Sequence, residues 1–118
     1  GQKAASPGMK YKHYAPKAKV VLVNGNTESF AEYVNQRKSD GVFALCFSED
    51  LPVLEVPSVC YGGEKHAEEQ AHALFDALRR LDDKKAQLVF AHCPSQDGVG
   101  LAVYNRLLRA AAFDVVKL

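Results

Sequence analysis

Four short, largely apolar runs recur along the chain, and each is followed by a polar residue, glycine or proline. They occupy residues 19–23, 42–47, 59–61 and 88–93, and the residues that directly follow them are Asn24, Ser48, Gly62 and Pro94. A continuous run of Val, Leu, Phe and Ala, without alternating polar residues, indicates a strand buried on both faces, as in parallel sheets. Parallel neighbours need a crossover segment between them, so the pattern predicts an α/β chain.

Helical periodicity fills most of the intervals between these runs. A first helix, capped by Asn26 or Thr27, is expected to end by Asp40-Gly41. Apolar residues at a spacing of three and four predict further helices over 67–81 and 99–112. The alternation predicts an α/β fold, a small Rossmann-like three-layer domain with a mostly parallel sheet of four to five strands.

The pattern predicts three further features of this fold less directly. Residues 48–50, Ser-Glu-Asp, are expected to form an acidic loop, because no long helical pattern follows the second run. Residues 115–118 can add a short strand or trail away. The strand order is expected to be Rossmann-like or flavodoxin-like.

The composition is that of an ordinary globular domain. A chain of 118 residues with 47% hydrophobic and 25% charged residues suits one compact domain. No apolar run approaches the about 18 residues of a membrane span, and no signal peptide is expected. Three separate cysteines, Cys46, Cys60 and Cys93, indicate reduced thiols in a cytoplasmic protein. Gly1, in place of Met, suggests an excised fragment.

The charge is unevenly distributed. Residues 1–19 contain five lysines and no acidic residue, so this segment carries +5. Because the whole chain carries +1, the remainder carries −4. A basic arm on a mildly acidic body can meet phosphate or an acidic partner. We expect no direct nucleic-acid binding, because the body lacks a basic face.

Ligands of open parallel sheets bind outside the carboxyl ends of the strands. The residues expected there form a possible pocket of the domain: Asn24, Gly25, Gly62, Gly63, Gly98 and Gly100. Gly98 and Gly100, at the start of the last helix, can expose backbone N–H groups to an anion. The same glycines also suit a tight strand-to-helix turn that binds nothing.

No catalytic constellation or metal site emerges from the body. His66 and His72 lie six apart, so they do not share the i, i+4 face that metal-binding helices use. His92 is expected at the edge of the core, and Asp97 is expected to cap the last helix. A hydrolase built on Asp97, His92 and Cys93 would crowd all its groups into one turn.

The N-terminal arm has an unusual composition. Residues 9–16, Met-Lys-Tyr-Lys-His-Tyr-Ala-Pro, interleave cations with aromatic rings and lack the period of a helix or strand. Lysines can meet phosphate and aromatic rings can stack on a base, which favours a nucleotide contact. A plain linker whose aromatic residues lean on the body is equally consistent with the pattern.

Residues 6–16, Ser-Pro-Gly-Met-Lys-Tyr-Lys-His-Tyr-Ala-Pro, closely resemble the interdomain linker of the two-domain threonylcarbamoyl-AMP synthases, the Sua-five family. The body resembles that family's C-terminal domain. Its Leu74–Asp82 segment is similar to the family's LF-x-x-LR-x-x-D helix, and Gly98–Ala111 to its GLG-x-A ending. The resemblance covers nearly the whole chain and divides it into a linker, 1–17, and a C-terminal Rossmann-like domain, 18–118.

The resemblance implies a function for the parent protein. Family members convert L-threonine, bicarbonate and ATP, with magnesium, into threonylcarbamoyl-AMP and pyrophosphate for tRNA threonylcarbamoyladenosine modification. Catalysis belongs to an N-terminal YrdC-like domain that this chain lacks, so no catalytic residue and no cofactor is expected here. By similarity, Tyr11, Lys12, His13 and Tyr14 would gate the nucleotide site of that domain.

Two alternatives remain beside this regulatory or accessory role. One is a free-standing Rossmann-like module that binds a small molecule at its glycine turns. The other, much less favoured, is the independent hydrolase considered above. A ligand that strongly stabilises the isolated domain would favour the first alternative.

Overall fold

The structure is a computed structural model and describes residues 15–118. Five strands and four helices alternate along this part of the chain. In order they are β1 (Lys19–Asn24), α2 (Thr27–Asn35), β2 (Val42–Cys46), the 3₁₀ helix η1 (Ser48–Val53), β3 (Ser58–Cys60), α3 (Ala67–Asp83), β4 (Leu88–His92), α4 (Val99–Ala110) and β5 (Val115–Lys117). The α/β prediction is confirmed, and residues 115–117 form a strand.

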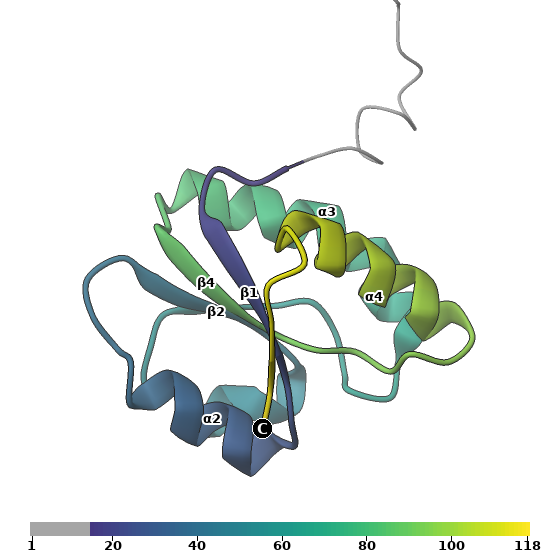
Figure 1. The fold of residues 1–118 in the computed structure, drawn as a ribbon, viewed down its shortest axis with the longest axis horizontal. Helices are drawn as coiled ribbons and strands as arrows, with labels where there is room; N and C mark the ends of the chain where they lie inside the picture. The colour runs from purple at the N-terminus through teal and green to yellow at the C-terminus, as the bar shows by residue number, and fades with distance from the viewer. Residues whose placement is uncertain (1–14) are drawn as a thin grey trace, which may run out of the picture.

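All neighbouring strands are parallel, in the order β3-β2-β4-β1-β5. The sheet lies between two helical layers, with α3 and α4 on one face and α2 on the other (Figure 1). The three-layer prediction is therefore confirmed. The strand order is neither the Rossmann order 3-2-1-4-5-6 nor the flavodoxin order 2-1-3-4-5, because β4 inserts between β1 and β2.

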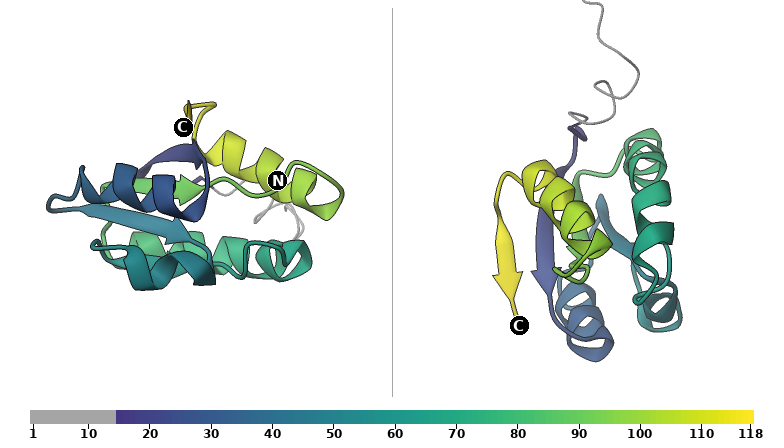
Figure 2. Two further views of the ribbon diagram at one scale, coloured as in Figure 1. Left: turned by 90° about the horizontal axis from the view of Figure 1, so that it is seen from below. Right: turned by 90° about the vertical axis from the view of Figure 1, so that its right-hand side faces the viewer.

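The continuous apolar runs supply both faces of the sheet. In β1, Val20 and Leu22 pack toward the core of α3 and α4, while Val21 and Val23 pack toward α2. Successive strand residues point to opposite faces, so a run without polar residues fills two cores at once. β5 pairs with β1 and forms the edge strand on that side of the sheet (Figure 2).

Local signals explain most element boundaries. The Asn26 side chain accepts the backbone N–H of Ser29 at 2.8 Å and caps α2, as expected. That helix ends at Asn35, earlier than the Asp40-Gly41 limit. Asp97 was expected to cap α4, which is wrong: the N-cap is Gly98, at φ +56°, without a side-chain cap bond. The Asp97 N–H instead bonds the Ser95 hydroxyl at 3.2 Å.

The acidic loop expected at 48–50 is also wrong. These residues open η1, whose N-terminal turn is closed by the carboxylate of Asp50 accepting the N–H of Phe47 at 2.8 Å. Asp50 is fully buried, whereas Ser48 and Glu49 are exposed. One acidic residue of the three therefore belongs to the interior of the protein.

Candidate functional site

The carboxyl end of the sheet holds a buried histidine–carboxylate pair. His92, the last residue of β4, is 1% exposed, and Asp50 of η1 is 0% exposed. His92 Nδ1 lies 2.7 Å from Asp50 Oδ2, and His92 Nε2 lies 2.6 Å from the carbonyl oxygen of Gly25. The pair thus joins β4, η1 and the turn after β1.

The two hydrogen bonds of His92 determine how many protons the His92–Asp50 pair carries. A carbonyl oxygen only accepts, so His92 Nε2 must carry the hydrogen that it shares with Gly25. At 2.7 Å, the Nδ1–Oδ2 contact also needs a proton on one of its two atoms. The pair is therefore neutral as a whole and carries no free acid or base toward solvent.

Aromatic rings hold His92 in place. The Phe30 ring stacks on the imidazole, with 4.3 Å between the ring centroids and 9° between the ring planes. The centroid of the Phe47 ring lies 4.6 Å from that of the imidazole. The hydroxyl of Tyr61 donates to the His92 carbonyl oxygen at 2.7 Å. Burial raises the pKa of Tyr61 well above its usual value, so the hydroxyl stays protonated and remains a donor. The sequence prediction of a core histidine is confirmed, but its partners come from three distant segments.

A pocket of about 520 Å³ opens above this pair. It lies at the carboxyl ends of β1 and β4, which are neighbours in the sheet. The chain leaves β1 toward α2 on one face and leaves β4 toward α4 on the other (Figure 1). This is a topological switch point, where open α/β sheets bind ligands.

Only some of the residues predicted to form the pocket line it in the structure. Asn24 and Gly25 line it. Gly62 and Gly63 lie in the β3–α3 turn, whose next residues, Glu64 and Lys65, reach the pocket. Gly98 and Gly100 begin α4, but the lining comes from the residues just before them, Ser95 and Asp97.

Gly100 has a structural role that the sequence did not separate from ligand binding. A Cβ there would lie 2.4 Å from the Ser95 carbonyl oxygen. That distance is shorter than any real Cβ contact, so glycine is needed for α4 to begin against the preceding turn. The glycine therefore shapes the pocket wall without lining it.

Two cysteines near the carboxyl end of the sheet are buried, which disfavours their reactive thiolate form. Burial raises the pKa of Cys93 to about 11. Burial and the nearby Asp50 carboxylate raise the pKa of Cys46 to about 12. Since both ring nitrogens of His92 are already engaged, no base is available to activate Cys93. The hydrolase alternative has no geometric support in residues 15–118.

Thiol labelling of the folded chain tests this assignment. We expect iodoacetamide at neutral pH to alkylate the half-buried Cys60 first and to leave Cys46 and Cys93 unmodified. A pKa near 12 leaves Cys46 about a thousandfold less thiolate than an ordinary cysteine. Peptide mass spectrometry locates the adducts, and labelling in urea, where all three cysteines should react, is the control. Rapid native labelling of Cys93 would contradict the buried-thiol assignment.

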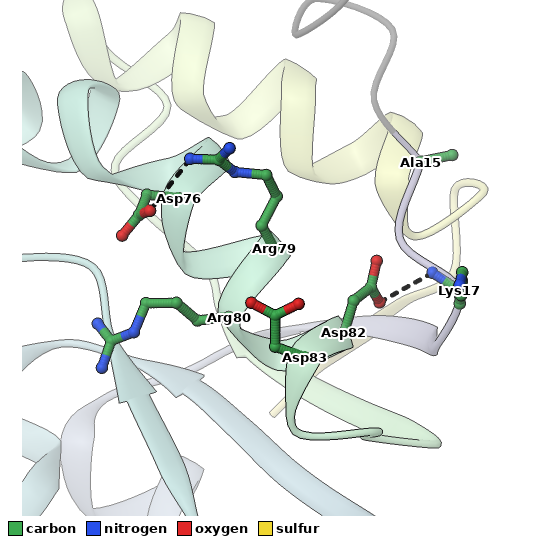
Figure 3. Close-up of a pocket in the computed structure, with 7 residues that line it drawn as sticks. All are labelled: Ala15, Lys17, Asp76, Arg79, Arg80, Asp82 and Asp83. Atoms are coloured by element: carbon green, nitrogen blue, oxygen red, sulfur yellow. Dashed lines mark hydrogen bonds and ion pairs between the residues drawn. The ribbon is translucent and has the colours of Figure 1, made fainter.

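A second feature lies where the described chain begins. Ala15 and Lys17 line a pocket of about 590 Å³ with the last turns of α3 (Figure 3). The Lys17 N–H donates to Asp82 Oδ1 at 3.0 Å. A carboxylate in the last turn of a helix is disfavoured by the helix dipole, so Asp82 gains from this N–H partner. The contact ties the root of the arm to the C-terminal end of α3.

Tyr11, Lys12, His13 and Tyr14, which are expected to gate the nucleotide site, lie outside the described residues, as does most of the expected 1–17 linker. Within 15–118, no cluster of His, Cys, Asp and Glu is arranged to hold a metal ion. Over the same range, no helix combines the length and the apolar character that a membrane crossing requires.

The parallel sheet, its two helical layers and the switch-point pocket define a Rossmann-like α/β domain. Comparison with known proteins then gives the family. The family model for the threonylcarbamoyl-AMP synthase C-terminal domain matches residues 1–112, so the chain belongs to that family. The resemblance found in the linker and in the α3 and α4 segments is thereby confirmed.

Individual relatives agree. The chain is 35% identical over 119 aligned residues to a Bacillus subtilis threonylcarbamoyl-AMP synthase, covering 98% of this chain and 34% of the relative. The crystal structure of Pyrococcus abyssi Sua5 complexed with L-threonine matches all of this chain and 35% of its own, at 31% identity and a TM-score of 0.70. The chain thus spans about a third of the length of these relatives.

An isolated domain has also been solved. The C-terminal Sua5 domain of a Pyrococcus horikoshii protein matches 88% of this chain and 100% of its own, with 30% identity and a TM-score of 0.63. A domain of this size and fold therefore forms a structure without the rest of a synthase. Experiments on the 118-residue chain alone are justified on that ground.

Proposed function

We propose that this domain serves a threonylcarbamoyl-AMP synthase as an accessory domain that positions the linker over a separate catalytic domain. The family match supports the assignment, because the chain corresponds to one third of the relatives' length and to their C-terminal domain. The remaining two thirds would include the YrdC-like domain. That domain would take L-threonine, bicarbonate and ATP with magnesium, in the cytoplasm, toward tRNA threonylcarbamoyladenosine.

The observation that carries the positioning role is the anchored root of the arm. The backbone N–H of Lys17 is held by Asp82 at the end of α3, so the start of the described chain is fixed to the domain at this point. An anchored end restricts where Tyr11 and His13 can reach, since a six-residue span from Lys17 covers at most about 20 Å. A movement of the domain would therefore move the gate with it.

The gate's chemistry follows from its residue types. Lys12 would meet phosphate oxygens as a point charge, while Tyr11 and Tyr14 would exclude water from the nucleotide. His13 would donate a hydrogen bond to an anionic oxygen. The bound ATP and magnesium would supply the phosphoryl chemistry, and the arm would close over them.

Replacement of Tyr11 and His13 by Ala in a full-length synthase carrying this domain tests the proposal. We expect threonylcarbamoyl-AMP formation to fall about 10-fold or more, since loss of closure misplaces the reacting groups. Pyrophosphate release and ATP affinity are the measurements. Lys3→Ala, in the same arm but outside the 6–16 segment, is the matched control. Unchanged kinetics and unchanged ATP affinity would refute the gating role.

The switch-point pocket gives a specific reason to keep a second function in view. Its volume of about 520 Å³ lies within the range of small-molecule sites. A binding module of this kind can coexist with the accessory role, because the pocket and the arm root are lined by different residues.

A further inference from the structure

The switch-point pocket has a rigid floor. His92, which forms part of it, is fixed by Asp50 through one ring nitrogen and by the Gly25 carbonyl through the other. Phe30 and Phe47 hold the ring from its two sides. Replacing a buried pair of this kind by apolar residues is often neutral or stabilising, so packing alone does not account for it. A floor that is held in one geometry before a ligand arrives is a property of binding sites.

The walls of the pocket carry charges of both signs. Lys65 approaches from the β3–α3 turn beside Glu64, and Asp97 approaches from the turn before α4. All three are exposed and free to adjust to a ligand. Two carboxylates against one ammonium disfavour a phosphate or any other purely anionic ligand.

A ligand with one cationic and one anionic group matches this lining. Its carboxylate can pair with Lys65, and its ammonium can pair with Asp97 or Glu64. The polar side chains of Asn24 and Ser95 supply additional hydrogen-bond partners in the same pocket. The volume suits a ligand of small size with its hydration water.

We propose that this pocket binds a free α-amino acid between Lys65 of the β3–α3 turn, which would pair with its carboxylate, and Asp97 of the turn before α4, which would pair with its ammonium. The site lies on this domain and is independent of the gating role of the arm. Occupancy would link the turns that follow β1, β3 and β4, since residues of all three line the pocket. The ligand would therefore stabilise the domain by mass action.

Calorimetric titration of the 118-residue chain with each standard L-amino acid, up to about 10 mM, tests the site. At least one amino acid should bind saturably. Its amide lacks the carboxylate, and its N-acetyl derivative lacks the ammonium. The affinity of each should be lower by about tenfold or more. If no amino acid binds, or if inorganic phosphate binds as tightly as the best amino acid, the proposal is overturned.

Variants locate the site. Lys65→Met and Asp97→Asn should each weaken binding about tenfold or more, because each removes a charge-assisted hydrogen bond. Lys84→Met is the matched control, since Lys84 is an exposed lysine at the opposite end of α3 and should leave the affinity unchanged. Circular dichroism verifies that each variant is folded. Equal affinity in Lys65→Met and the unmodified chain would place the ligand elsewhere and reject the pocket.

Discussion

Asp50→Ala should lower the free energy of unfolding by about 3–5 kcal/mol, which is the expected cost of removing one partner of a buried polar pair. The substitution leaves His92 Nδ1 without its partner in an enclosure of aromatic rings. It also removes the acceptor of the Phe47 N–H, which closes the first turn of η1. Urea unfolding followed by circular dichroism measures the loss.

The neighbouring Glu49→Ala is the control for this prediction. Glu49 is exposed in the same turn, so its removal should cost less than about 1 kcal/mol. The double variant Asp50→Ala with His92→Leu should be less destabilised than the sum of the two single variants, because it no longer leaves His92 or Asp50 buried without the other. A loss below about 0.5 kcal/mol in Asp50→Ala would show that the pair does not hold the sheet edge together.

Local patterns predicted the fold well where a single segment carried the signal. The apolar runs located β1, β2 and β4, because strands buried on both faces need uninterrupted hydrophobic residues. Asn26 marked the start of α2 through its own side-chain chemistry. The strand order was missed because insertion of β4 between β1 and β2 depends on packing among segments far apart in sequence.

The candidate site shows the same limit more sharply. Asp50 follows two exposed polar residues, Ser48 and Glu49, and gives no local sign of burial, yet its partner is His92, 42 residues away. No spacing rule connects these positions. Asn24 and Gly25 could be placed at the pocket because they end a predicted strand, whereas Lys65 and Asp97 could not, since neither sits in a strand or helix. The signal that could have found Asp50 is an acidic residue shortly after a buried strand, at the edge of the sheet where a histidine ends another strand.

Phe30→Ala is the second substitution for which we expect a large effect, a loss of about 3–5 kcal/mol in the free energy of unfolding. Phe30 is completely buried and comes from α2, the α-helix that covers this face of the sheet within residues 15–118. Its ring fills the space over Val21, Val23 and Phe90 and stacks on His92. Truncation leaves a cavity that the sheet cannot close.

Phe30→Leu separates the two contributions of that ring. Leucine keeps most of the volume but loses the stack on His92, so it should cost about 1–2 kcal/mol, less than the alanine variant. Equal losses for the two variants would mean that stacking, and not the filled volume, fixes α2 on the sheet. If instead Phe30→Ala costs under about 1 kcal/mol, the α2 layer contributes little, and His92 at the floor of the switch-point pocket must be held mainly by its contacts with Asp50, Phe47 and the Gly25 carbonyl.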